Sequence, residues 1–267
     1  MKFHFPQPRE LSLKFAASFI NTEDKLQVWR KAIGDITPDS YLEEVGNDIS
    51  FSAIRGMVLA PYQLTKYGVA LTEAAKSKAQ EIYREAIKRP EISNVVIRIG
   101  PTASGKSTMT RTLGIRGDSE GTLVYEDHLD SLDNVIKLVD EARADGLSVD
   151  VEGFYREPLE AFNSVIQRAK ETGKIVPVDY AAETYRTFEA NWPKLVQSLK
   201  DKRSVTISLF NNSFGVGNAK EISPEELPKT NTTNLEKNFQ QQLEAAKEEK
   251  VISPTLYNQF NAQRSMR

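Results

Sequence analysis

Eight consecutive residues match the pattern G-x-x-x-x-G-K-[ST], which cradles the phosphate groups of a nucleoside triphosphate. They are Gly100, Pro101, Thr102, Ala103, Ser104, Gly105, Lys106 and Ser107, with Thr108 directly after them. The glycines let the backbone turn tightly and approach phosphate oxygens, while successive N–H groups attract the anion. Lys106 would reach the β- and γ-phosphates, and the Ser107 hydroxyl would bind Mg²⁺. The pattern therefore predicts a phosphate-binding loop at residues 100–108.

A second group of candidate residues is acidic and follows the short apolar run 122–125. The carboxyl ends of parallel strands form the ligand crevice, so a carboxylate here could accept a proton from an acceptor hydroxyl or hold Mg²⁺. Asp127 is the first candidate for both roles, with Glu126 and Asp130 as alternatives. The other interpretation is a solvated charge or a helix cap. His128 could donate a hydrogen bond to a substrate or be an ordinary surface histidine.

Three further charged candidate residues lie later in the chain. Glu152 would face the crevice, and Arg156 could bind a phosphate or a substrate carboxylate. The alternative for both is a loop salt bridge of Arg156 with Glu152 or Glu157. Arg186 would neutralise charge on a transferred phosphoryl group, or it is an exposed helical arginine.

Short β-branched runs alternate with helical patterns through the middle of the chain, and these elements must position the candidates. The expected strands are residues 95–99, 122–125, 147–151, 174–180 and 204–210. The expected helices are residues 107–113, 131–144, 158–172 and 183–200, the last with a kink or break at Pro193. This alternation predicts a parallel, doubly wound α/β sheet.

Helical patterns also flank this region. Residues 11–20 are mostly apolar, a helix is expected to begin at Pro38 or Asp39, and residues 71–88 form the clearest helix. After the sheet, residues 234–249 predict a surface helix, and residues 251–260 a final apolar turn.

Composition limits the classes of function. The chain has 267 residues, a net charge of -2, no cysteine and two histidines. The charge balance disfavours a nucleic-acid partner, which needs a positive excess. The absence of cysteine excludes disulfides and thiol chemistry, and two histidines exclude a His-rich metal site. No apolar run approaches the roughly 18 residues of a membrane helix, so we expect a cytoplasmic protein without a membrane partner, and leave open its secretion as an effector.

The order of these motifs resembles that of the zeta toxin family of P-loop kinases. The resemblance covers about residues 71–218. It rests on the phosphate loop, on Glu126-Asp127-His128 where the family has its acidic catalytic segment, on Val151-Glu152-Gly153-Phe154-Tyr155-Arg156, and on residues 191–195 and 208–212. The resemblance implies a three-layer P-loop NTPase fold of the kinase type, and ATP-dependent phosphorylation of a hydroxyl on a nucleotide-linked sugar, such as a UDP-sugar, or another metabolite.

The sequence departs from the family pattern on the acceptor side. His128 falls on the family's usual aspartate position if the second strand is aligned without a gap, and Phe154 replaces a small hydroxyl residue. The lid between the expected fourth and fifth strands is short and offers one plain arginine, Arg186. The identity of the phosphate acceptor therefore stays open.

Together these observations predict a P-loop kinase core at residues 71–218, between a helical N-terminal extension (1–70) and a polar helical C-terminal extension (219–267). The predicted catalytic residues are Lys106, Asp127, Glu152, Arg156 and Arg186, and the predicted metal ligands are Ser107 and Asp127. The cofactors would be ATP and Mg²⁺. The partners would be a small hydroxyl acceptor and, if the family's biology transfers, an antitoxin protein.

Two alternatives stay open. A nucleotide-dependent switch or interaction protein would keep the phosphate loop but lack kinase activity. The octet also resembles the loop of tRNA dimethylallyltransferases, but the further Asp-Ser-x-Gln-x-Tyr and Ile-Gly-Thr-x-Lys-Pro segments of that family are missing.

Overall fold

The sheet is arranged around β2 (Asn94–Ile99), the strand that leads into the phosphate loop. A computed structural model describes residues 22–59, 63, 68–106, 120–172, 175–215 and 218–262. Its six strands lie in the order β1-β3-β2-β4-β5-β6. The others are β1 (Asp48–Ile49), β3 (Thr122–Asp127), β4 (Ser148–Tyr155), β5 (Val205–Asn211) and β6 (Lys220–Ile222). All neighbours pair in parallel except β5 and β6.

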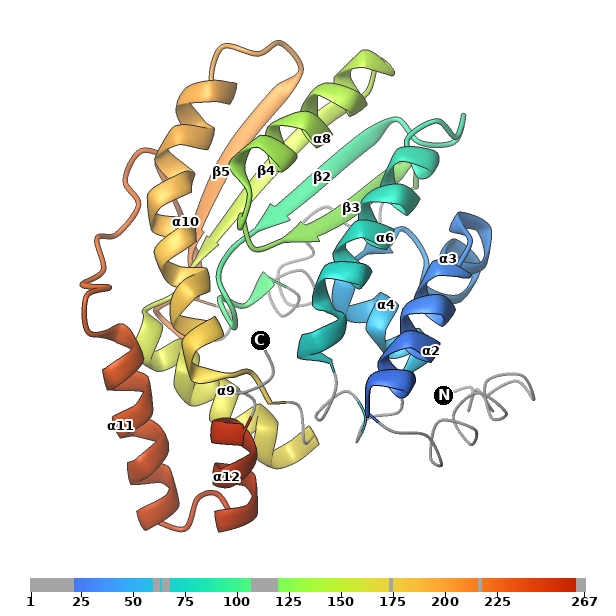
Figure 1. The fold of residues 1–267 in the computed structure, drawn as a ribbon. Coiled ribbons are helices and arrows are strands. Elements are labelled where there is room, and N and C mark those ends of the chain that lie inside the picture. The colour runs from blue at the N-terminus through green and yellow to red at the C-terminus, as the bar shows by residue number, and fades with distance from the viewer. Residues whose placement is uncertain are drawn as a thin grey trace.

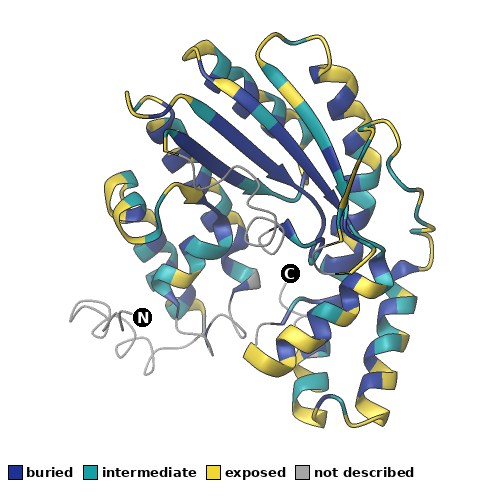
Figure 2. Cartoon of the chain, turned by 180° about the vertical axis from the view of Figure 1, so that it is seen from behind, coloured by how far each residue is buried: buried dark blue, intermediate teal, exposed yellow. Residues whose placement is uncertain are grey.

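The register of the three central strands places their carboxyl ends side by side. Ile99 of β2 lies opposite Asp127 of β3 and Gly153 of β4. The last five residues of β2 are buried, as expected for a parallel strand that is covered on both faces. Figure 2 shows this in the dark blue of the central strands. The loop after β2 therefore begins beside the acidic end of β3.

Three helices lie along one face of the sheet: α6 (Thr72–Ala86), α8 (Leu132–Ala144) and α10 (Val178–Leu199) (Figure 1). Each turns an apolar stripe towards the strands. In α8 the buried residues are Val135, Leu138, Val139 and Ala142, the spacing of one helix face. Its N-cap, Ser131, accepts a hydrogen bond from the Asn134 N–H at 3.4 Å.

The N-terminal part packs directly on this core. It comprises α2 (Thr22–Gly34), α3 (Pro38–Val45), α4 (Phe51–Val58) and the short 3-10 helix Val69–Leu71. β1 joins the sheet beside β3, and the Tyr41 hydroxyl donates to Asp48 O at 2.8 Å and accepts from the Ser50 N–H at 3.1 Å. These bonds fix the turn from β1 into α4. Buried residues from α2 to β5 form one hydrophobic cluster.

A second hydrophobic cluster joins α9 (Pro158–Thr172) and α10 to the C-terminal helices α11 (Leu235–Glu248) and α12 (Pro254–Ala262). Phe162 stacks on Phe239 at 4.3 Å between ring centroids. The first cluster thus extends across residue 70, and the second extends across residue 218. The division into a core of residues 71–218 and two extensions stays a proposal.

The fold class is confirmed: a mixed α/β chain with a mostly parallel sheet and flanking helices, consistent with the P-loop kinase fold. Most expected elements of the described residues agree within a few positions, including the helix that begins at Pro38 and the helix 158–172. The expected helix 107–113 and the apolar run 11–20 lie outside the described residues. No helix in the described part is both long and apolar enough to cross a bilayer.

Two predictions are wrong. Residues 175–177 form no strand, and α10 begins at Val178, so the expected fourth strand is absent there. Val178, Ala181, Ala182 and Tyr185 are buried at helical spacing, which outweighs the β-branched composition. Of the kink or break expected at Pro193, the break is also absent, because α10 continues through this residue. Burial of Phe188, Trp192, Leu195 and Val196 on both sides of the proline compensates for the lost hydrogen bond.

Candidate active site

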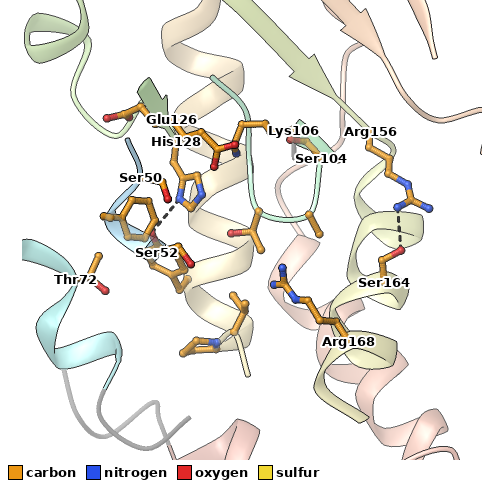
Figure 3. A pocket seen from close by; sticks show the side chains of 18 of the residues that line it. Ser50, Ser52, Thr72, Ser104, Lys106, Glu126, His128, Arg156, Ser164 and Arg168 are labelled. Carbon is orange, nitrogen blue, oxygen red and sulfur yellow. Dashed lines mark hydrogen bonds between the residues drawn. The ribbon is translucent and has the colours of Figure 1, made fainter. Parts of the chain in front are cut away.

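A cavity of about 310 Å³ opens at the carboxyl ends of the central strands. The phosphate loop forms its floor, and residues 126–128 line it from the end of β3. One wall comes from α4 and the start of α6, and the opposite wall comes from α9 and residues 175–177. Figure 3 shows Ser50, Ser52 and Thr72 on one side, and Arg156 and Arg168 on the other.

The phosphate loop has the tight backbone that its glycines predict. A Cβ on Gly100 would lie 2.5 Å from Phe154 O and 2.6 Å from Ser104 Oγ, so only glycine fits. Gly105 has a φ of +95°, a left-handed conformation that favours glycine. Asn212 Nδ2 donates to Ser104 O at 3.1 Å and holds the loop against the end of β5.

Lys106 is buried at the base of the loop. Its Nζ donates to Gly100 O at 2.6 Å and to Pro101 O at 3.3 Å. Burial lowers the pKa of the Lys106 ammonium to about 8, although Glu126 and Asp127 nearby act to raise it. The ammonium thus contacts neutral carbonyls that a phosphate oxygen would replace favourably.

The loop residues that the structure describes fit a triphosphate. The hydroxyls of Thr102 and Ser104 are buried and have no hydrogen-bond partner. Together with Lys106 and the close backbone approach at Gly100, they form a set of donors around a space for phosphate oxygens. The predicted loop residues Ser107 and Thr108, and with Ser107 one of the two predicted Mg²⁺ ligands, lie outside the described residues.

Asp127 lies at the end of β3 and lines the cavity. Its Oδ1 accepts a hydrogen bond from the Leu129 N–H at 2.6 Å, which orients the carboxylate. Burial raises the pKa of Asp127, and the Leu129 N–H partly opposes this shift. A raised pKa suits a group that must accept a proton from a hydroxyl. Of the two alternatives, Glu126 lines the same cavity, whereas Asp130 pairs with Lys76 of α6.

His128 also lines the cavity rather than the outer surface. Its Nδ1 lies 3.0 Å from the Tyr180 hydroxyl, and its ring meets the edge of Phe51 at 5.2 Å. Burial, followed by the nearby cations Lys106 and Lys76, keeps the pKa of His128 well below its usual value. The imidazole is therefore neutral near pH 7, and it can form hydrogen bonds without adding charge.

The arginine wall of the cavity comes from the end of β4 and from α9. Arg156 lines the cavity, and its Nη1 donates to Ser164 Oγ at 2.9 Å. Arg168, one helical turn after Ser164, directs its guanidinium into the cavity (Figure 3). The spacing of Glu160, Ser164 and Arg168 by four residues was a signal in the sequence for a shared helix face, but it does not show that this face lines the site.

Two of the predicted catalytic residues lie elsewhere. Glu152 is buried beside Arg98 of β2, with 3.2 Å between Glu152 Oε2 and Arg98 Nε, and it does not line the cavity. Arg186 is half-exposed on α10, where it pairs with Glu183 at 3.1 Å, also away from the cavity. The structure thus brings together Lys106, Asp127 and Arg156, and adds Arg168, which the sequence reasoning missed.

The described residues contain no cluster of three acidic or histidine side chains that could hold a metal. Mg²⁺ usually takes one or two protein ligands and completes its shell with water and substrate phosphates. The Asp127 carboxylate is a suitable ligand at the end of β3.

The sheet, the phosphate loop and the cavity define the P-loop kinase class of fold. The family model described as Zeta toxin matches residues 118–214 and thus confirms the resemblance for less than half of the chain. This segment carries Asp127, Arg156 and Arg168, and it begins after the phosphate loop. The family consists of P-loop phosphotransferases that use ATP, so the match implies a P-loop kinase-like function. No curated protein matches the chain.

Proposed function

We propose that this protein is a kinase that transfers the γ-phosphoryl group of ATP to a hydroxyl group of a small molecule. The observation that carries the proposal is the convergence of Lys106, Asp127, Arg156 and Arg168 on one cavity. A phosphate cradle, a carboxylate of raised pKa and two arginines are the groups that phosphoryl transfer requires.

In the proposed reaction the acceptor oxygen bonds to the γ-phosphorus of ATP while the bond from that phosphorus to the bridging oxygen breaks. ADP keeps the electron pair of the broken bond. Asp127 takes the hydroxyl proton, and its hydrogen bond from the Leu129 N–H holds the carboxylate in place. Lys106 leaves the carbonyls of Gly100 and Pro101 to bind phosphate oxygens.

Arg156 and Arg168 approach the phosphates from the α9 wall and stabilise the charge of the transferred group. They take the role that the sequence suggested for Arg186. Mg²⁺, when bound, would be held by the Ser107 hydroxyl and Asp127, and it supplies neutralisation of phosphate charge. Glu152 acts on the site indirectly, because its pair with Arg98 fixes β4 beside β2.

The acceptor proposed from the family resemblance is a nucleotide-linked sugar or a related metabolite. A protein that consumes such a metabolite would act as a toxin or effector, and an antitoxin protein would then be its partner. Its proposed site of action is the cytoplasm.

The test is incubation of the purified protein with a metabolite extract, ATP and Mg²⁺, followed by mass spectrometry. The expected product is heavier than a metabolite by one phosphoryl group. Lys106→Ala should abolish it, and Asp127→Asn should reduce it about 10²- to 10⁴-fold, the usual contribution of a general base. Asp130→Asn is the matched control, because Asp130 pairs with Lys76 outside the cavity lining.

ATP binding without any phosphorylated product, in extracts or on proteins, would instead favour the switch or interaction protein. A tRNA-modifying transferase would consume no ATP γ-phosphate.

A further inference from the structure

The N-terminal wall of the cavity carries an arginine that the proposed phosphoryl transfer does not use. Arg55 of α4 lines the cavity together with Ser50, Phe51 and Ser52. This wall lies on the acidic side of the phosphate loop, next to β3, and faces the α9 wall with Arg156 and Arg168 (Figure 3). It also lies outside residues 118–214, so the family match says nothing about it.

Arg55 is held in one position by neutral groups. Its Nη1 donates to Gly68 O at 2.7 Å and to Thr72 Oγ1 at 3.1 Å, and its guanidinium lies 5.0 Å from the centre of the Phe51 ring. Thr72 Oγ1 in turn donates to Gly68 O at 3.2 Å. These contacts orient the guanidinium, but they do not neutralise it.

The charge of Arg55 is not paired within the described part of the chain. No described carboxylate forms an ion pair with Arg55, and its Nε is buried without a hydrogen-bond partner. An enclosed cation without a counter-ion is costly, and burial accordingly lowers the pKa of the guanidinium. An anionic ligand would repay this cost, because a guanidinium binds phosphate or carboxylate with two parallel hydrogen bonds.

The start of α4 reinforces the same preference. Ser50 is the N-cap, and its Oγ accepts from the Ala53 N–H at 3.1 Å. The first N–H groups of a helix have no acceptor within it, and its N-terminus favours negative charge. Ser50, Phe51 and Ser52 all line the cavity, so this end of α4 and Arg55 act on the same space.

We infer that residues 50–55 and Thr72 form an anion subsite that holds a phosphate or carboxylate of the acceptor while its hydroxyl lies at Asp127. The acceptor is thus an anionic metabolite, and neutral sugars or alcohols are poor substrates. This inference rests on the proposed kinase function, and it assigns the N-terminal extension a part in substrate selection.

The first experiment fractionates a metabolite extract by anion exchange and supplies each fraction with [γ-³²P]ATP, Mg²⁺ and the wild-type protein. Labelled product is expected from anionic fractions alone. Treating the fraction beforehand with phosphatase and phosphodiesterase, which are then removed, distinguishes the sources. Loss of the product identifies a phosphate group, and its persistence identifies a carboxylate. A labelled product from the neutral fraction would overturn the inference but leave the kinase in place.

The second experiment tests Arg55 directly. Arg55→Gln should lower kcat/KM for the anionic fraction at least about tenfold, the cost of losing a charged hydrogen bond, with ATP affinity within about twofold of wild type. The matched control is Arg186→Gln, because Arg186 is a half-exposed arginine outside the cavity. If Arg55→Gln turns over the acceptor as well as wild type does, the inference is wrong. If the Arg55→Gln protein fails to bind ATP, the measurement is made with Arg55→Lys instead.

A third measurement separates the inference from the proposed function. Inorganic phosphate is titrated by calorimetry into protein that is already saturated with a non-hydrolysable ATP analogue and Mg²⁺. Phosphate is expected to bind to the wild-type protein, and Arg55→Gln is expected to lower the affinity for phosphate about tenfold. Binding without any kinase product would contradict the proposed function but support the anion subsite. No binding, or binding unchanged in the variant, would contradict the subsite.

Discussion

Arg98 and Arg55 both place a guanidinium inside the molecule, and their surroundings differ. Arg98 lies between β2 and β4 with Glu152 at 3.2 Å, and the side chains are 1% and 7% exposed. Arg55 faces the cavity, where a carbonyl, a hydroxyl and an aromatic ring surround it. Arg98 therefore has its counter-ion within the fold, whereas no carboxylate of the described residues pairs with Arg55, and the proposed anion would supply its partner.

This difference separates cations that build the sheet from cations that bind substrate. The parallel register puts Arg98 directly opposite Glu152, two residues before the phosphate loop begins. The pair joins neighbouring strands at the base of the site. By contrast, Arg168 reaches the cavity without a carboxylate partner among the described residues. The N–H donors of the Arg168 guanidinium are therefore available to the phosphate groups of ATP in the proposed reaction.

The largest expected effect comes from breaking the pair in the sheet. Glu152→Leu leaves the Arg98 charge buried without its counter-ion, so unfolding in urea should show a loss of about 3–5 kcal/mol. The double variant Arg98→Met/Glu152→Leu should recover most of this loss, because apolar residues of similar volume replace the whole pair. A Glu152→Leu protein of normal stability that cannot transfer phosphate would instead support the role in the site that the sequence suggested.

An arginine of the cavity should behave in the opposite way. Arg168→Gln should lower kcat about 10- to 100-fold, equivalent to about 1.4–2.7 kcal/mol of transition-state stabilisation. Its stability should change by less than about 0.5 kcal/mol, because no side chain of the described residues pairs with the Arg168 guanidinium. Steady-state kinetics and urea unfolding on the same preparation measure the two effects. A rise in KM for ATP with unchanged kcat would show that Arg168 binds the ground state only.

The contrast also explains how far the sequence could predict the site. The phosphate loop is local: its glycines, Lys106 and the adjoining strand lie within a few residues, and the loop has the expected backbone. Asp127 was predicted as a site residue because a carboxylate that follows a parallel strand lies at the carboxyl ends of the strands, where the ligand crevice forms. Glu152 was predicted to face the crevice because it lies at the end of the expected third strand, but its partner Arg98 is 54 positions away and only the register brings the two together.

The parts that sequence reasoning missed depend on tertiary structure. Arg55 belongs to a helix with no motif, and it reaches the site because β1 joins the sheet and directs α4 across the cavity. The wrong strand at residues 174–180 has a similar cause. Val-Pro-Val favours a strand locally, but Val178 begins a helix stripe that α9 and α11 bury. Without that strand, residues 175–177 are free to line the cavity.

The pH dependence of ATP binding sharpens the comparison further. Burial lowers the pKa of Lys106 to about 8 in the nucleotide-free protein, whereas bound phosphate favours the charged ammonium. ATP affinity should therefore fall about tenfold between pH 7 and pH 9, where most of the free ammonium is deprotonated. Calorimetry in buffers of different ionisation enthalpy should detect proton uptake on binding at pH 8.5. Lys106→Met should remove both effects, and a flat profile in wild type would contradict them.

The same pKa shift has a consequence for stability, with a defined sign. The pKa of Lys106 is about 8 in the folded chain and has its ordinary value of 10.5 in the unfolded chain. Between about pH 8 and pH 10.5 the unfolded chain therefore binds more protons than the folded chain. The contribution of Lys106 to stability therefore rises with pH through that window. Comparing the pH dependence of urea unfolding in wild type and Lys106→Met isolates it.

The smallest effect is expected at Arg186, which the sequence placed among the catalytic residues. Its Nη1 pairs with Glu183 on the same helix at 3.1 Å, and the side chains are 36% and 51% exposed. Exposed pairs of this kind contribute about 0–1 kcal/mol, so Arg186→Gln should change kcat/KM less than twofold and stability by less than about 0.5 kcal/mol. A drop as large as that of Arg168→Gln would mean that α10 brings Arg186 to the phosphates once substrates bind. The distinction between paired and unpaired cations would then hold for the nucleotide-free protein alone.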